Sequence, residues 1–290
     1  MDKTTVTGAT VTRQAAASDR LSPLGRLLRG WRQARSVSQL ALAAEADTTQ
    51  KYLSFIESGR ARPSREMVLR LAVALDVPLR DRNQLLVAAG YAPLYLESSL
   101  DGPALAQVRT ALEMLLHHSE PQAAIAVDRN WNLLMTNRAA MRLFSDFLED
   151  ADLWATVSPG GEQNLLRLLF HPAGLKRYIV NWEEVALATL DRARRENDSL
   201  GGNDALTALL DDLVDYEGIP ERWRAPDWEA PPRPHLPVVL VKDNIQLTFV
   251  TLISTFGTPQ DITLQELRIE TFLPADEATS AYMQRLATTS

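Results

Sequence analysis

The sequence has no cysteine and only four histidines among its 290 residues. The lack of cysteine excludes disulfides, thiolate metal sites and a cysteine nucleophile. His117, His118, His171 and His235 show no HExxH or paired spacing, so we expect no metal site. No run approaches about 18 consecutive apolar residues, and residues 1–20 contain no apolar core of a signal peptide. We therefore expect a cytoplasmic protein with no membrane segment.

Patterns typical of catalysis are also missing. The acidic pairs at 183–184 and 211–212 are interpreted as solvated helix faces and not as a general acid and base. No histidine has serine and aspartate partners that form a recognisable triad. Gly201-Gly202 precedes a helical pattern but lacks the lysine and hydroxyl residue of a phosphate-binding loop. We expect no enzyme and assign no catalytic residue.

Charge is divided unevenly along the chain. Residues 1–92 carry 14 Lys and Arg against 8 Asp and Glu, whereas the remaining 198 residues carry 16 against 29. The overall net charge of −7 hides this contrast. A basic first third joined to an acidic remainder indicates a polyanion-binding module attached to a module of another kind.

The basic third has the pattern of a compact helical bundle. Residues 1–20 are rich in Thr, Ala and Ser without periodicity, and we expect a disordered tail there. From Leu24 onward apolar residues recur at helical spacing, and Ser38 and Thr49 are placed to begin the second and third helices. Gly59, Pro78 and Gly90 mark later helix ends. Five short helices are predicted between residues 24 and 92, with a tight turn between the second and third.

This pattern resembles the lambda-repressor-like, or XRE, helix-turn-helix family over about residues 24–92. The motifs at fixed offsets are Ser38-Gln39, Leu42-Ala43, Ser54, Ile56-Glu57-Ser58-Gly59-Arg60, Pro63-Ser64 and Leu71-Ala72-x-Ala74-Leu75. The resemblance implies binding to double-stranded DNA, with the N-terminal residues of the third helix at the base edges of the major groove.

The residues that contact bases are expected at fixed positions before Glu57 in the third helix. Base-contacting candidates are Thr49, Gln50, Lys51, Ser54 and Phe55, which offer adenine, guanine and thymine-methyl contacts. Candidates for phosphate contacts, which position the protein without reading sequence, are Gln39, Arg32, Arg35, Arg60, Arg62 and Arg65. Because one such bundle reads only a few base pairs, we expect a homodimer on a near-palindromic site.

The second half has the pattern of an α+β domain. Residues 93–103 are predicted to be a linker because they contain Pro93, Gly102 and Pro103. A hairpin is predicted from runs 123–127 and 132–136, followed by several helices and by strands at 238–241, 245–256 and 262–273. Two strands, a run of helices and three strands is the order of a PAS-like antiparallel sheet covered by helices.

Residues 104–275 also resemble the MmyB/MltR-type ligand-binding domain, and we place the domain at 104–277. The segments that carry the resemblance are Ala126-Val127-Asp128-x-x-Trp131-Asn132, Asn137-Arg138-Ala139-Ala140, Asn164 to Phe170, Asn181 to Ala186 and Glu266 to Thr271. Thr136 stands where the family often has tryptophan. The resemblance implies a transcription factor that holds an apolar small molecule, with a fatty acyl chain as the leading candidate.

The sequence permits such a ligand because the covering helices are rich in Leu, Phe, Trp and Met, which suit an apolar cavity. Our candidates for the lining are Met135, Arg138, Phe144, Leu168, Tyr178, Trp182, Phe249 and Leu267, with Arg138 or Tyr178 placed to meet a carboxylate head. The alternative is that this core is filled and the domain only dimerises or docks a protein partner. A dry cavity would favour the first interpretation, and a filled core with an exposed apolar patch the second.

Overall fold

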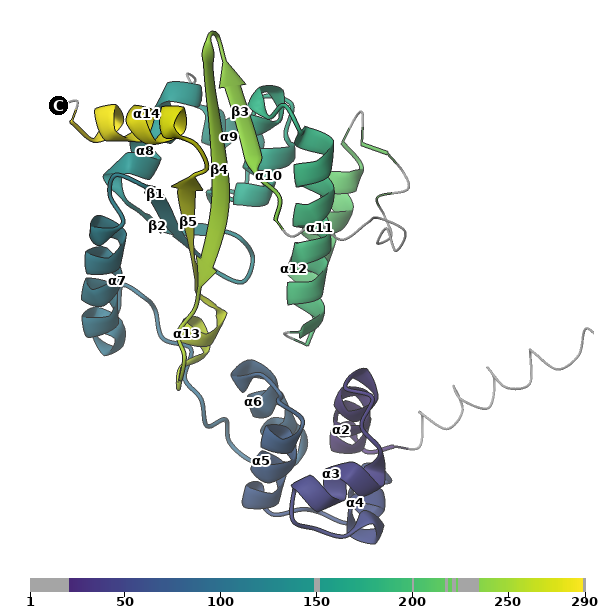
Figure 1. Ribbon diagram of the computed structural model, residues 1–290. Coiled ribbons are helices and arrows are strands. Elements are labelled where there is room, and N and C mark those ends of the chain that lie inside the picture. The colour runs from purple at the N-terminus through teal and green to yellow at the C-terminus, as the bar shows by residue number, and fades with distance from the viewer. Residues whose placement is uncertain are drawn as a thin grey trace, which may run out of the picture. The chain divides into compact units, whose positions relative to one another are not determined.

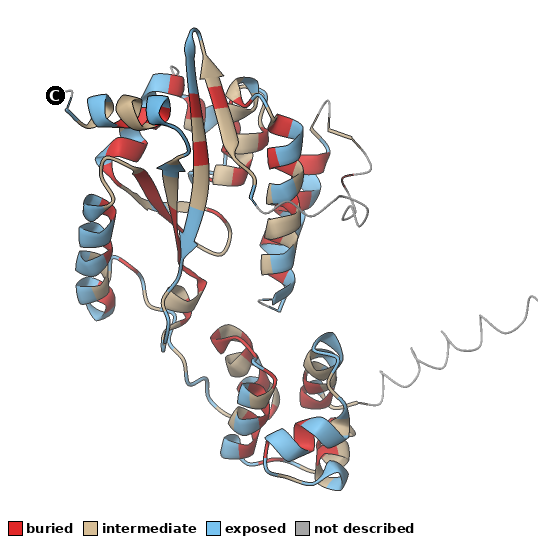
Figure 2. Cartoon of the chain, in the orientation of Figure 1, coloured by how far each residue is buried: buried red, intermediate tan, exposed pale blue. Residues whose placement is uncertain are grey.

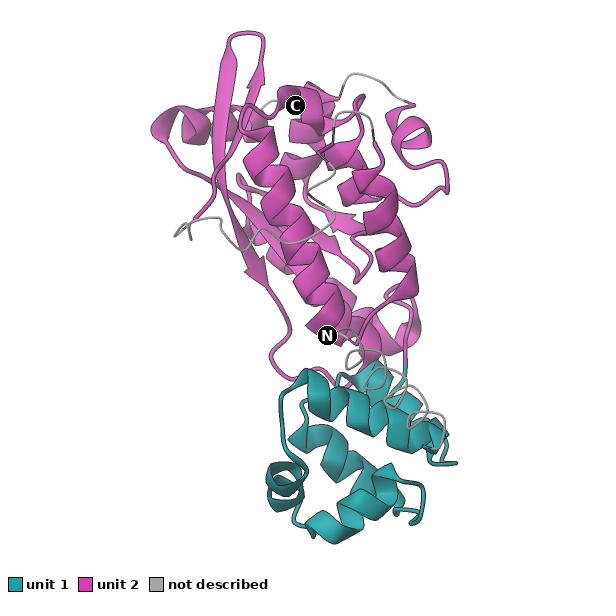
Figure 3. Cartoon of the chain, turned by 90° about the vertical axis from the view of Figure 1, so that its right-hand side faces the viewer, with its two compact units in different colours: residues 1–96 teal, residues 97–290 magenta. Residues whose placement is uncertain are grey.

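The computed structural model describes residues 21–148, 152–199, 201–216, 219–220, 223 and 235–288. The chain forms two compact units, residues 1–96 and 97–290, coloured teal and magenta in Figure 3. The expected disordered tail, residues 1–20, lies outside the described residues.

The first unit is a bundle whose described helices are short and individually capped (Figure 1). Ser22, Ser38, Thr49 and Ser64 each precede a helix and accept a hydrogen bond from a backbone N–H in its first turn. These caps satisfy donors that the helix itself leaves free. The helices are α2 (Pro23–Ala34), α3 (Gln39–Glu45), α4 (Gln50–Glu57), α5 (Arg65–Ala74) and α6 (Leu79–Ala88).

One core holds this bundle together, and the expected five helices are present. Leu28, Leu42, Leu53 and Ile56 are almost fully buried, each on a face set by helical spacing. Helices α2 and α4 approach so closely that a Cβ on Gly25 would lie 2.0 Å from the carbonyl oxygen of Glu57. Only glycine fits at this crossing.

The expected linker, residues 93–103, is shared between the two units. Asn83 of α6 accepts hydrogen bonds from the backbone N–H groups of Leu94 and Tyr95. Ser98, in the second unit, donates its backbone N–H to Asp261 and accepts a bond from the Thr263 hydroxyl at 2.7 Å. The residues before Leu96 are therefore hydrogen-bonded to the first unit, and Ser98, after it, is hydrogen-bonded to the second.

The second unit contains a five-stranded antiparallel sheet in the order β2-β1-β5-β4-β3. Its strands are β1 (Ala123–Val127), β2 (Leu133–Thr136), β3 (Val238–Lys242), β4 (Ile245–Ser254) and β5 (Arg268–Pro274). Strand β5 lies between β1 and β4, with Ile125 opposite Glu270 and Val250 opposite Leu273. The PAS-like antiparallel sheet covered by helices is confirmed.

Helices cover both faces of this sheet at β1, whose five residues are all buried (Figures 1 and 2). Ala124 and Ala126 face α7, whereas Ile125 and Val127 face the core beneath α8, α10, α11 and α12. The helical elements of this unit are η1 (Pro103–Leu105), α7 (Ala106–His118), α8 (Arg138–Phe147), α9 (Leu153–Val157), α10 (Leu165–Phe170), η2 (Leu175–Tyr178), α11 (Trp182–Ser199), α12 (Asp204–Val214), α13 (Ile262–Glu266) and α14 (Glu277–Thr288).

Two elements of this unit differ from the sequence-based expectation. The segment 262–273 was expected to be one strand, but it begins as the short helix α13, and β5 starts at Arg268. Asp261 begins α13 by accepting a hydrogen bond from the backbone N–H of Thr263 at 2.9 Å. Beyond the expected domain end at 277, α14 packs fully buried Met283 into the main core. Of the helices that the structure describes, none is both long and apolar enough to span a membrane.

We predict that Asn137→Ala destabilises the second unit by about 2–3 kcal/mol. The buried side chain begins α8 and accepts hydrogen bonds from the backbone N–H groups of Ala140 and Ala124. It also donates to the carbonyls of Leu116 and Gln122, so four bonds are lost together. Hydrogen–deuterium exchange of β1 and α8 measures the effect.

The matched control is Asn203→Ala, which removes the cap of α12 at a less buried position. We expect about 1 kcal/mol there. Equal losses for the two variants would contradict the role given to Asn137.

Candidate functional site

The first turn of α4 presents polar side chains to solvent. Thr49, Gln50 and Lys51 are exposed, and the Thr49 hydroxyl accepts a hydrogen bond from the backbone N–H of Tyr52 at 3.2 Å. Leu53 and Ile56 are fully buried on the opposite side of the helix. The bundle therefore fixes the helix by its apolar face and leaves its N-terminal turn free to meet a partner.

Two cations flank Phe55 on the same helix. Phe55 and Ser54 are half-buried, the Arg60 guanidinium lies 4.4 Å from the centre of the Phe55 ring, and Lys51 Nζ lies 5.9 Å from it. Such contacts hold the basic groups beside the turn without removing their charge. This part of the surface combines positive charge with an aromatic edge.

Glu57 ties three helices of the bundle together. Its carboxylate, in a residue only 4% exposed, accepts hydrogen bonds from Arg32 Nε at 2.7 Å and from Gln39 Nε2 at 2.8 Å. Arg32 also donates to the carbonyl of Val37. The structure thus places Arg32 in a buried ion pair, so it is not an open phosphate-contacting group, and Gln39 is held half-buried at the start of α3.

The other arginines proposed for phosphate contacts are exposed but differ in their partners. Arg35 donates to the carbonyls of Leu75 and Asp76 beyond the end of α5, which orders its side chain within the bundle. Arg62 lies 5.7 Å from the Tyr91 ring, and Arg60 and Arg65 are exposed. Arg60, Arg62 and Arg65 therefore remain the accessible basic set.

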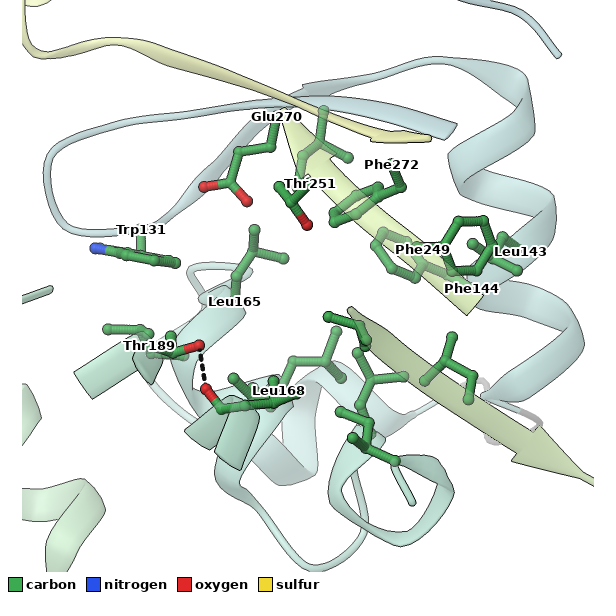
Figure 4. A pocket seen from close by; sticks show the side chains of 18 of the residues that line it. Trp131, Leu143, Phe144, Leu165, Leu168, Thr189, Phe249, Thr251, Glu270 and Phe272 are labelled. Carbon is green, nitrogen blue, oxygen red and sulfur yellow. Dashed lines mark hydrogen bonds between the residues drawn. The ribbon is translucent and has the colours of Figure 1, made fainter. Parts of the chain in front are cut away.

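The second unit contains a partly open cavity of about 160 Å³ between the sheet and α8, α10 and α11 (Figure 4). Phe144, Phe249 and Phe272 lie toward one end, and Trp131 lies toward the other. The carboxylate of Glu270 and the hydroxyl of Thr251 point inward from β5 and β4. The remaining lining residues are Ile125, Leu143, Phe147, Leu165, Leu166, Leu168, Leu169, Leu175, Ile179, Val185, Thr189, Arg192, Val238 and Leu240.

Three of the eight expected lining residues face this cavity: Phe144, Leu168 and Phe249. Met135 and Leu267 instead pack on the opposite face of the sheet with the core beneath α7. Arg138 has an exposed side chain paired with Glu120 at 2.9 Å, Tyr178 packs edge-on against Phe147, and Trp182 packs between Phe170 and Trp223. Neither Arg138 nor Tyr178 is placed to meet a ligand head group in this cavity.

Four charged side chains close the Trp131 end, and we call them the charge quartet: Arg192, Glu196, Arg268 and Glu270. Arg192 donates from Nη2 to Glu270 at 2.5 Å and from Nε to Glu196 at 2.8 Å. Arg268 pairs with Glu196. The side chains of Arg268 and Glu270 are only 8% and 6% exposed, so these charges are effectively removed from water.

The two arginines of the quartet lie over Trp131, whose backbone holds an uncommon conformation. Its φ is 67°, a region that bulky residues rarely adopt and that costs of order 1–3 kcal/mol. Asp128 holds this turn by accepting bonds from the backbone N–H groups of Asn130 and Asn132, each at 2.8 Å. The guanidinium groups of Arg192 and Arg268 lie 4.4 and 5.1 Å from the Trp131 ring centre.

Burial and neighbouring charges shift the pKa values of the two arginines in opposite directions. Burial acts to lower the pKa of Arg192, but the carboxylates of Glu270 and Glu196 outweigh it, so this pKa is raised. For Arg268, burial dominates and lowers the pKa despite the attraction of Glu196. The carboxylates of the quartet therefore stabilise the charge of Arg192 more than that of Arg268.

The quartet was not predicted from the sequence, because charged residues are mostly exposed in proteins and are therefore assigned to the surface. One signal was available. Arg192 and Glu196 are four apart on one helix face, and Arg268 and Glu270 alternate on one strand face with Phe272. Charged residues in phase with an apolar strand face indicate that they point into the core.

An exposed N-terminal helix turn on a helical bundle, joined to a sheet domain with an apolar cavity, defines a helix-turn-helix regulator with a sensing domain. Residues 23–85 match the family described as a helix-turn-helix domain. Residues 108–286, more than half of the chain, match the MmyB-like transcription regulator ligand binding domain. The chain belongs to this family and is a DNA-binding, ligand-responsive transcription regulator.

No curated protein matches the chain. Among solved structures, one described as the "Structure of an RNA-binding Light-Oxygen-Voltage Receptor" is similar at 11% sequence identity and a TM-score of 0.28. The alignment covers 99% of this chain and 69% of that one. Similarity at this level carries no argument about fold or function.

We predict that Glu57→Ala destabilises the first unit by about 3–5 kcal/mol, because Arg32 is left buried without its partner. Hydrogen–deuterium exchange of α2, α3 and α4 measures the loss. The control is Glu66→Ala, which removes an exposed pair with Arg70 at 4.0 Å and is expected to cost less than about 0.5 kcal/mol. Unchanged exchange in Glu57→Ala would show that the buried pair does not stabilise the bundle.

Proposed function

We propose that the protein binds a near-palindromic operator as a homodimer and that an apolar, acyl-like small molecule in the cavity shifts its affinity for DNA. The observation that carries the proposal is the cavity itself. An ordinary filled core would have no such space, whereas this one is lined almost entirely by apolar side chains with a few polar groups at one end. That composition is typical of small-molecule sites.

Sequence-specific DNA contact is assigned to the exposed turn of α4. Gln50 can bond adenine through two hydrogen bonds, Lys51 can donate to guanine, and the Thr49 methyl or Phe55 can contact a thymine methyl group. Ser54 lies one turn further along. We assign phosphate contacts to the exposed residues Arg60, Arg62 and Arg65, and to Gln39 at the start of α3.

The size and shape of the cavity limit which apolar body a ligand can have. A volume of about 160 Å³ is close to that of an engineered apolar cavity of roughly 150 Å³ that binds benzene. A short acyl chain fits this space between Phe144 and Trp131, and a longer chain requires side chains to move. Fatty acids and related acyl compounds share the required apolar body.

Dimerisation is supported by an uncovered apolar part of the sheet. Leu252 on β4 is 54% exposed and Leu273 on β5 is 38% exposed, and both lie on the face opposite the cavity. This patch also favours the second candidate function, in which the domain acts only as a dimerisation or protein-docking module. The two candidates differ in whether the cavity takes a ligand.

Ligand control requires two states of the protein with different ligand affinities. In the proposal, filling the cavity favours one arrangement of the dimer and therefore one spacing of the two recognition helices. A compound that binds both arrangements equally would change nothing, however tightly it binds.

We predict that Gln50→Ala weakens binding to an operator selected from random duplexes by about 1–3 kcal/mol and relaxes preference at one base position. Arg62→Ala is the contrasting variant: it should weaken binding to all sequences alike and reduce the salt slope by about one. Fluorescence anisotropy over a salt series measures both effects. Intact affinity and preference in Gln50→Ala would show that α4 docks in another register.

The cavity can be filled by a single substitution on β3. Val238 lines it from β3, whereas Val239 on the same strand does not, so Val238→Phe fills the cavity and Val239→Phe is the matched control. We expect an acyl compound in near-stoichiometric amount in an organic extract of the purified wild-type protein, analysed by mass spectrometry. It should fall on the order of tenfold in Val238→Phe and stay unchanged in Val239→Phe.

An empty wild-type extract, together with no binding of added acyl compounds, would favour the dimerisation or docking alternative. Equal retention by the two variants would place the ligand elsewhere.

A further inference from the structure

The polar end of the cavity differs from what a carboxylate ligand requires. Two arginines and two glutamates meet there, and each guanidinium already faces a carboxylate of the quartet. The quartet is therefore neutral as a whole. A further charge brought into it would have no unpaired counter-charge and would lose its hydration, which is costly in a buried site.

The charges next to the quartet do not alter this balance in favour of an anion. Arg129 and Glu266 form their own buried pair at 2.9 Å. The Asp128 carboxylate is bonded to the backbone N–H groups of its own turn and adds negative charge near Arg268. Counting these groups, the surroundings of Arg192 and Arg268 oppose a negatively charged ligand.

Hydrogen-bonding capacity is nevertheless left open toward the cavity. Glu270 Oε1 accepts from Arg192, whereas Oε2 accepts no hydrogen bond from the described residues. The Thr251 hydroxyl, which points inward beside it, also makes none to the described part of the chain (Figure 4). An ionised carboxylate is an acceptor only, so a ligand group that meets Glu270 must donate.

Resting on the ligand-binding function proposed above, we infer that the cavity selects a neutral ligand with an apolar body and a hydrogen-bond-donating end, such as a hydroxyl-bearing neutral acyl compound or, as its simplest analogue, an alcohol. The donor bonds Glu270 Oε2, and Thr251 supplies a second, adaptable partner. Phe144, Phe249 and Phe272 contact the apolar body. An ionised fatty acid is disfavoured because the quartet is neutral as a whole and offers no unpaired positive charge.

Isothermal titration calorimetry of the full chain near neutral pH tests this with four compounds of one chain length: 1-octanol, octanoate, octylamine and 1-methoxyoctane. We expect 1-octanol to bind and the anion, the cation and the donor-free ether to bind at least about tenfold more weakly. This comparison uses the wild-type protein, so it does not depend on how any variant folds.

The variant Glu270→Gln extends the test. It removes one negative charge and makes the quartet net positive, so octanoate should gain at least about tenfold in affinity relative to 1-octanol. Glu183→Gln is the control, because it removes one negative charge at an exposed position of α11 outside the quartet and should leave the rejection of octanoate unchanged. Circular dichroism of each variant verifies its fold.

The outcomes separate this inference from the function on which it rests. Wild-type binding of octanoate as tight as that of 1-octanol, or tighter binding of octylamine or the ether, would overturn the selection for a neutral donor while leaving ligand binding intact. No binding of any of the four compounds would overturn the sensing function of this cavity and the inference together.

Discussion

Four charged side chains at one end of the cavity, two of them almost fully buried, join a long helix to the middle of the sheet. Glu196 and Arg192 come from α11, Arg268 and Glu270 come from β5, and the two arginines lie against a tryptophan held in an unfavourable backbone conformation. Such a set is stable only when complete, because removing one member leaves another charge buried and unpaired. The set therefore ties α11 to β5 beside the cavity.

Asparagine side chains position the elements around that site. Asn137 joins the start of α8 to β1, Asn164 joins the start of α10 to the Trp131 turn, and Asn181 joins the segment before α11 to β3. Each has both donors and an acceptor on one short side chain, so it can cap a helix and bond a neighbouring strand at once. These three asparagines lie in three of the segments that carry the family resemblance.

The bundle could be predicted closely from the sequence, whereas the cavity could not. Caps such as Ser38 and Thr49 and apolar helical spacing act locally, so they determine the helices without knowledge of distant contacts. Which strand face a residue occupies depends on pairing with remote strands, and β1, buried on both faces, shows no alternation to reveal it. Leu267 and Met135 were consequently assigned to the cavity although they face α7, and Arg192 and Glu270 were not considered. Helix α13 was missed because its five residues are rich in β-favouring types, and the cap at Asp261 decides its structure.

The contacts of Asn181 have a consequence for how this sheet meets other chains. The outer edge of β3 is bonded by the preceding segment, through the Val180 N–H to the Val239 carbonyl and through Asn181 to Pro237 and Val239. At the opposite edge β2 is only four residues long, and Gln163 accepts a bond from its first residue, Leu133. Open strand edges are the usual template for strand addition and aggregation. Because both edges are short or occupied, pairing of a further strand is hindered at either edge, and the exposed side-chain faces are what this sheet offers to other chains.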